Sequence, residues 1–309
     1  MSEVNAARIN NLQSRIELLL GTGAGQFGYG QTVNSSQVSA LNGLIQASDL
    51  NQIYADILKA RIHQVGPGNI QLAELVANLN IIAEETSFFV NDQGVQSADP
   101  NGNLKGILDF ERMMNTLETD KFLMDPSQAT LAPAITSVRT STWNGTREHE
   151  FIVTFTSENH RRHFFNSGGQ IRFSASNTNA VTPKGLDWAE LTNDVGTVIF
   201  NYNSTRSTGD GSIVMLGNYD LTGSYQTIYE KIGSGTFSAI YAGNVYTIRA
   251  RVDTVNRLFF SVLFQDLVTG TTIDNDVDGR LESRVQQFYA NNPDGVAVPT
   301  PSFFNQKTL

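Results

Sequence analysis

The chain has 309 residues, a formal net charge of -9, only 17% charged residues and no cysteine. The length suits one large domain or two ordinary ones. The lack of thiols excludes a disulfide framework, thiolate catalysis and a cysteine zinc site, and the acidic balance argues against a nucleic-acid partner.

The first 125 residues have the periodicity of amphipathic helices. One face of the first helix collects apolar residues at spacings of 3, 4 and 3, namely Ile9, Leu12, Ile16 and Leu19. Three later stretches repeat this pattern: residues 49–65, 69–85 and 106–118. Asp49 is the expected N-cap of the second helix. Because such apolar faces need a partner surface, we interpret residues 1–125 as a helical docking or oligomerisation region.

Residues 23–28 read GAGQFG and match the Gly-x-Gly-x-x-Gly fingerprint of dinucleotide-binding enzymes. That fingerprint works only where a buried strand precedes it and a helix follows with its N-terminus toward the pyrophosphate. Here a helix pattern precedes it and a polar run follows. We therefore interpret the stretch as a flexible connector, with Gly21 closing the first helix, and predict no cofactor.

Near Asp125-Pro126 the periodicity changes from about 3.6 to 2. Residues 135–157 read as two strands around an Asn144-Gly145 hairpin turn. Further strands are expected at residues 168–176, 196–203, 245–252 and 257–264, with one short helix at 186–195. Strands without regular helices between them predict an α+β chain whose second part is an antiparallel β-sandwich of the jelly-roll or Ig-like kind.

We therefore predict three regions: helices over 1–125, a β-sandwich domain over 126–290 and an extended C-terminal tail over 291–309. Prolines exclude a helix from the tail, which is either loose or laid on a neighbour. The N-terminus, MSEVNAARIN, lacks a signal-peptide pattern, and no apolar run approaches the roughly 20 residues that span a bilayer. No membrane insertion is expected.

Histidines and acidic residues are the candidate metal ligands and catalytic side chains. His149, His160 and His163 could in principle bind zinc. On a strand, however, residues three apart point to opposite faces, so we interpret this stretch as a polar strand edge or turn. Carboxylates close in sequence occur, such as Asp187 and Glu190, but nothing singles out a catalytic pair. We predict no catalytic residue, no metal ligand and no enzyme.

Asp274, Asp276 and Asp278 match positions 1, 3 and 5 of a calcium loop. Position 12, which should be a bidentate glutamate, is Val285. An acidic hairpin turn is favoured over a weak structural calcium site.

Four segments together resemble virion structural proteins of tailed bacteriophages, particularly those of contractile-tailed marine and freshwater phages. They are FGYGQTVNSSQVSA (27–40), LNQIYADILKARIHQVG (50–66), RRHFFNSGGQIRFSAS (161–176) and DVDGRLESRVQQFYANNPDGVAVPTPSF (276–303). HFFNSGG, residues 163–169, is the most specific of them. The resemblance implies a building block of the neck, tail, baseplate or fibres, present in the virion and assembled in the cytoplasm of the host bacterium.

The implied partners are further copies of the chain, as a homo-oligomer, and other virion proteins. Within HFFNSGG, Phe164 and Phe165 are candidate subunit contacts, with Gly168 and Gly169 allowing close backbone approach. The alternative is a core aromatic pair beside a strand turn. An alternative function is a receptor-binding module that recognises a host surface glycan through the β-sandwich.

Overall fold

The computed structural model describes residues 5–38, 45–67, 87–88, 96–97, 107–233, 236, 238–268 and 276–309. The chain clusters into two compact units. Unit 1 comprises Met1–Thr130, Arg162–Gly168 and Tyr289–Pro299, and unit 2 comprises Leu131–Arg161, Gly169–Phe288 and Thr300–Leu309. Each unit draws on separated segments, whereas the sequence predicted three consecutive regions; the boundaries after residues 125 and 290 stay predictions.

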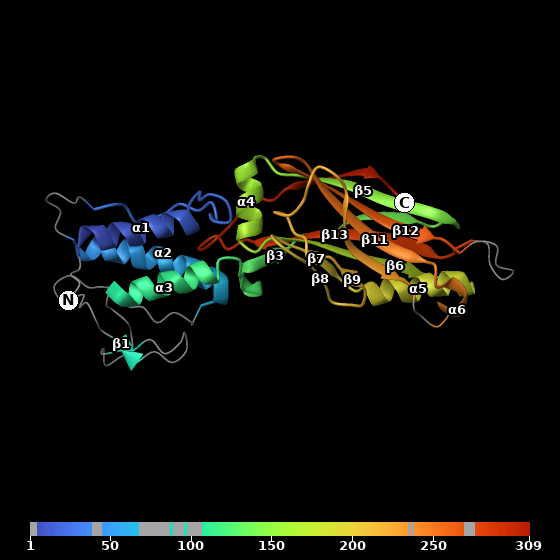
Figure 1. Cartoon of the computed structure of the whole chain (residues 1–309), viewed down its shortest axis with the longest axis horizontal. Coiled ribbons are helices and arrows are strands. Elements are labelled where there is room, and N and C mark those ends of the chain that lie inside the picture. The colour runs from blue at the N-terminus through green and yellow to red at the C-terminus, as the bar shows by residue number, and fades with distance from the viewer. Residues whose placement is uncertain are drawn as a thin grey trace. The chain divides into compact units, whose positions relative to one another are not determined.

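Unit 1 contains three helices that lie side by side (Figure 1): α1 (Ala6–Leu20), α2 (Ala47–Val65) and α3 (Ile107–Thr119). Two ion pairs join α1 to α3, Arg8 to Glu111 at 2.8 Å and Arg15 to Glu118 at 2.7 Å. Because partners on both helices are seven residues apart in the same direction, α1 and α3 run parallel.

After α1, residues 28–38 form an extended segment that leads back toward the start of α2, so that α1 and α2 run parallel. It runs back along α1, from the Tyr29 amide bonded to the Leu19 carbonyl to the Val38 amide bonded to the Asn10 side chain. The carboxylate of Asp56 on α2 binds the backbone amides of this segment at 2.8 to 3.1 Å. Buried apolar residues of the three helices form the core: Ile9, Leu12, Ile16, Leu50, Ile53, Ile57, Phe110, Met113 and Leu117.

The helix predictions for unit 1 are confirmed at α1 and α3, and α1 ends before Gly21 as expected. Asp49 is not the N-cap of α2. The helix begins earlier, and Asp49 sits at the third helical position, where its carboxylate accepts from the amide of the N-cap Gln46 at 2.9 Å. The predicted helix over 69–85 lies outside the described residues. Two short strands, β1 (Ser87–Phe88) and β2 (Gln96–Ser97), pair antiparallel.

Two antiparallel sheets dominate the remaining chain, so the fold is α+β. The first sheet runs in the order β14 (Ser302–Lys307), β5 (Gly145–Thr154), β12 (Arg257–Asp266), β11 (Val245–Thr254), β10 (Gln226–Ile232), β9 (Ser212–Ile213). The second runs β3 (Ala129–Leu131), β13 (Arg280–Ala290), β6 (Gln170–Thr178), β7 (Val198–Phe200), β8 (Thr205–Ser207), and β4 (Ile135–Arg139) also pairs with β13.

Aromatic rings of the two sheets contact each other in unit 2. Phe260 on β12 lies 5.2 Å from Phe173 on β6 and 5.2 Å from Phe200 on β7, measured between ring centroids. The described residues contain three further helices, α4 (Glu158–Asn166), α5 (Pro183–Val195) and α6 (Ser238–Tyr241), and the 3-10 turn η1 (Pro126–Gln128).

Two predictions for the second half of the chain are wrong. Residues around Asn144-Gly145 do not form a hairpin, because β4 pairs with β13 whereas β5 pairs with β12 and β14. Residues 158–166 form the helix α4 and not a strand edge. Within the predicted tail, residues 292–295 form a turn, and β14 pairs with β5 of its own chain.

Candidate functional site

The glycine loop, residues 21–30, leaves α1 and folds back on it. The amides of Gly30 and Gln31 donate to the carbonyls of Gly21 and Leu20 at 2.8 and 2.9 Å. Gly23 and Gly30 both have positive φ, 60° and 70°. A β-carbon on Gly30 would come within 2.7 Å of the His163 ring carbon Cγ, so the loop and α4 approach at a glycine.

Side chains of α4 donate hydrogen bonds to carbonyls of the glycine loop. Arg162 Nη2 donates to the Thr22 and Gly23 carbonyls at 2.9 and 3.1 Å, and His163 Nε2 donates to the Thr22 carbonyl at 2.9 Å. Asn166 Nδ2 lies 3.4 and 3.5 Å from two further loop carbonyls. The loop is therefore fixed, not flexible, and its carbonyls face donors of its own chain.

This geometry differs from that of a dinucleotide loop, which presents backbone N–H groups to a pyrophosphate at a helix N-terminus. Here GAGQFG follows the C-terminus of α1, and side chains of α4 donate to its carbonyl oxygens. GAGQFG therefore lies in the connector that follows α1, and the bonds from α4 hold it in place, whereas the sequence predicted a flexible connector.

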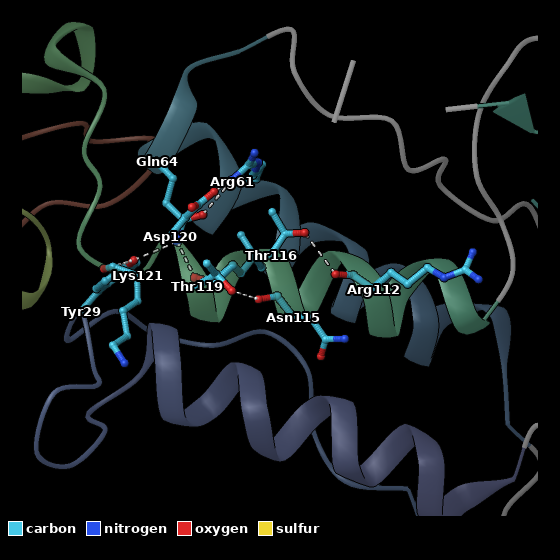
Figure 2. Close-up of polar contacts among 10 residues, drawn as sticks. Tyr29, Arg61, Gln64, Arg112, Asn115, Thr116, Thr119, Asp120 and Lys121 are labelled. Carbon is cyan, nitrogen blue, oxygen red and sulfur yellow. Dashed lines mark hydrogen bonds and ion pairs between the residues drawn. The ribbon is translucent and has the colours of Figure 1, made fainter. Parts of the chain in front are cut away.

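The loop continues into a buried polar hub at the carboxyl ends of α2 and α3, defined by Tyr29, Arg61, Gln64 and Asp120 (Figure 2). The Tyr29 hydroxyl donates to the Lys121 carbonyl at 2.6 Å and accepts from Gln64 Nε2 at 3.1 Å. The same Gln64 amide donates to the Leu117 carbonyl at 2.8 Å, and this bond satisfies one of the last carbonyls of α3.

Arg61 joins α2 to the end of α3. Its Nη1 lies 2.6 Å from Asp120 Oδ2 and 3.3 Å from Gln64 Oε1. The guanidinium is buried, whereas Asp120 is partly exposed. A buried charge must be paired to be tolerated, so this contact fixes the relative position of the two helix ends.

His63 lies beside the hub, with its ring 5.0 Å from that of Tyr29 in an edge-on arrangement. Burial lowers the pKa of His63 from 6.5 to about 4, against weaker opposite effects of the Ser167 backbone and the Asp125 carboxylate. The unfolded chain therefore binds a proton below pH 6.5 that the folded chain takes up only near pH 4.

We expect the free energy of unfolding of unit 1 to fall by up to about 3 kcal/mol between pH 6.5 and pH 4 through His63, and to lose nothing further from it at lower pH. His63→Phe, which keeps an aromatic ring beside Tyr29, should flatten this part of the pH profile in urea unfolding followed by helix circular dichroism. His160→Gln, at a histidine that is not buried, is the matched control. A profile of equal slope in His63→Phe and wild type would contradict the prediction.

The predicted subunit-contact residues are all buried. Phe164 and Phe165 on α4 are 0% exposed and pack edge to face, with ring centroids 5.1 Å apart. Gly168 has φ 81°, and a β-carbon there would come within 2.7 Å of Met124 Cβ; Gly169 is also buried. The core alternative describes this pair, which lies on α4 next to the turn at residues 167–168 that leads into β6.

The calcium candidates have other roles. Asp278 accepts from the Val181 and Thr182 amides and, at 2.6 Å, from the Thr182 hydroxyl, so it holds the start of α5. Asp276 Oδ1 accepts from Asn144 Nδ2 at 2.8 Å, and Asp274 lies outside the described residues. These bonds give Asp276 and Asp278 structural roles. The predicted hairpin turn is wrong, because the flanking strands β12 and β13 belong to different sheets.

The three histidines considered as zinc ligands each have protein partners, which for His160 is the Thr156 hydroxyl. His149 on β5 lies between the Ser283 hydroxyl and Asn305 Oδ1, both at 3.0 Å, whereas His163 binds the glycine loop. In the described ranges, no three His, Asp or Glu side chains are grouped so that they could hold a metal ion. Nor does any helix of the described chain have the length and apolar character to cross a membrane.

Comparison with protein-family models, with curated proteins and with solved structures gave no match.

The polar hub was not predicted from the sequence. Its members lie on segments that are far apart in the chain, and each is an ordinary polar residue of a helix face or a loop. The sequence does hold a signal for a different contact, that between α1 and α3. Arg8 and Arg15 are seven residues apart, as are Glu111 and Glu118, and this common spacing fits two ion pairs between parallel helices.

Proposed function

We propose that the chain is a non-enzymatic structural protein of a tailed phage particle, a component of the tail, neck, baseplate or fibre attachment. It acts by self-association and by contacts with other virion proteins, is assembled in the cytoplasm of the host bacterium and resides in the virion. The resemblance of the four segments motivates this proposal.

One observation supports the proposal most directly: the segment 28–35 contacts each of the other three resembling segments. Its amides bind Asp56 of α2, its Gly28 carbonyl faces Asn166 of α4, and its Gln31 side chain bonds both the amide and the carbonyl of Ala297. The side chains of a catalytic site would converge on a reactive centre. These side chains instead bind backbone groups and hold the segments together, as expected of a structural protein.

The sandwich part of the proposal rests on the aromatic contacts between the two sheets. A jelly-roll or Ig-like sandwich in which Phe260 lies between facing sheets would give the particle a packed β module.

We expect the purified chain to form a discrete multimer in light scattering across a range of concentrations. The edge strand β14 carries Phe304, which is 66% exposed, so Phe304→Ser should weaken this assembly. Val181→Ser, at an 80% exposed apolar residue outside the sheets, is the matched control. A monomer at every concentration, with no binding to other particle proteins, would contradict the proposal.

The alternative proposal is a receptor-binding module that recognises a host surface glycan. Trp143 and Trp188 do not favour it, because both are buried, with ring centroids 5.1 Å apart. Tyr225 is more exposed, and the Arg251 guanidinium carbon lies 5.2 Å from its ring centroid. Glycan-array binding that Tyr225→Ala abolishes would support this alternative, and a blank array would exclude the glycans tested.

A further inference from the structure

We propose that Lys184 and Asp266 form an amide bond within the chain, which joins the start of α5 covalently to the end of β12. The two side chains are already in contact, with Lys184 Nζ 2.8 Å from Asp266 Oδ2, and each side chain is only 1% exposed. Unit 2 cannot be cross-linked by a disulfide, because the chain has no cysteine.

The surroundings of the pair disfavour two separate charges. Both groups are removed from water, and a buried ion pair recovers the cost of desolvation only in part. Burial raises the pKa of the Asp266 carboxyl, an effect that Lys184 opposes. Transfer of one proton from the ammonium to the carboxylate gives a neutral amine beside a neutral acid, which are the forms that condense.

A second buried carboxylate stands one helical turn away. Asp187 follows Lys184 by three residues, so the two project from the same face of α5. Its Oδ2 accepts from Asn244 Nδ2 at 2.9 Å, whereas its buried Oδ1 has no hydrogen-bond partner in the described chain. Burial raises the pKa of Asp187, the hydrogen bond from Asn244 opposes this, and the Glu190 and Asp266 carboxylates raise it further.

The reaction balances without any oxidant or co-reactant. The Lys184 nitrogen lone pair attacks Asp266 Cγ, the C–N bond forms, and Asp187 takes a proton from the nitrogen and returns it to a carboxyl oxygen. That oxygen leaves as water and the amide remains. Amine and acid are held in contact in a buried site, so the entropic cost of bringing them together is already met and the water produced is lost to solvent.

Hydrogen bonds hold the reacting amine and the proton-accepting carboxylate in place. Lys184 Nζ donates to the Val268 carbonyl at 2.9 Å, so the amine is held between that oxygen and the Asp266 carboxyl. Asn244 orients Asp187 and is itself buried. All of these residues belong to unit 2.

Intact-mass spectrometry of the denatured full chain tests the proposal. We expect a mass about 18 Da, one water, below the value calculated from the sequence. Peptide mapping should find the segments containing Lys184 and Asp266 joined, with no cleavage by trypsin at Lys184. A mass equal to the calculated value would overturn the proposal, as would a deficit that maps to any other peptide.

Variants separate the bond from other dehydrations. Lys184→Met should restore the full calculated mass of that variant. Lys231→Met is the matched control, because Lys231 is also buried but lies 3.7 Å from a partly exposed Asp194, and it should retain the deficit. Asp187→Asn, which keeps a partner for Asn244, should leave a large fraction of folded chains without the bond. Complete bond formation in Asp187→Asn would overturn the role given to Asp187.

Discussion

Gly23→Ala should destabilise unit 1 by about 4 kcal/mol or more. Gly23 has φ 60°, a conformation that costs an alanine about 1–2 kcal/mol by itself. The added β-carbon would also lie 2.5 Å from Gly28 Cα and closer still to the Phe27 carbonyl oxygen. These are backbone atoms, so no side-chain rotation relieves the overlap.

Gly25→Ala is the matched control for this prediction. Gly25 has nearly the same φ, 57°, and belongs to the same loop, but a β-carbon there meets nothing within 4 Å. Gly25→Ala should lower the free energy of unfolding only by the cost of placing an alanine in this left-handed backbone conformation, about 1–2 kcal/mol. The difference between the two variants therefore isolates the folded-back shape of the loop.

Urea unfolding followed by helix circular dichroism would measure both glycine variants. Hydrogen exchange of peptides from α1 and from residues 162–166 would show whether the loss is local to the contact between the loop and α4. Equal destabilisation by Gly23→Ala and Gly25→Ala would mean that the loop does not fold back as described.

The elements that the sequence predicted correctly have a local cause. α1 and α3 carry an apolar stripe of helical period long enough to be read without knowing their partners. The same holds for β11 and β12, whose confirmed positions follow from alternation or from a continuous apolar run. In each case the residues of the segment alone indicate which face is buried.

The errors arise where a partner decides the structure. Asn144-Gly145 has the composition of a hairpin turn, yet Trp143 pairs its backbone with Val277 and the Asn144 side chain binds Asp276. These distant contacts direct β4 to one sheet and β5 to the other. A turn signal fixes a local bend, whereas strand pairing depends on residues more than a hundred positions away.

The helix α4 was missed for a related reason. Its sequence, ENHRRHFFN, is too short and too polar for the period to be recognised, and its buried residues, from His163 to Asn166, are consecutive. Their burial depends on a glycine loop that lies about 140 residues earlier in the chain. The glycine loop and HFFNSGG were both recognised as unusual segments, but nothing in either predicts that they bind each other.

Phe260→Ala should destabilise unit 2 by about 3–5 kcal/mol, the usual cost of removing a fully buried phenylalanine. The Phe260 ring contacts Phe151 on its own sheet at 5.4 Å and Phe173 and Phe200 on the other sheet, so its loss leaves a cavity lined from both sides. Rings of neighbouring strands cannot close such a cavity without moving the sheets.

Phe304→Ala is the control for Phe260→Ala, because Phe304 lies on the edge strand β14 and is largely exposed; it should change stability by less than about 0.5 kcal/mol. Tryptophan fluorescence during urea unfolding reports this unit specifically, since Trp143 and Trp188 both belong to unit 2. If Phe260→Ala lowered the free energy of unfolding by less than about 1 kcal/mol, the two sheets would not share this aromatic core. A cavity between packed layers destabilises a protein by more than that.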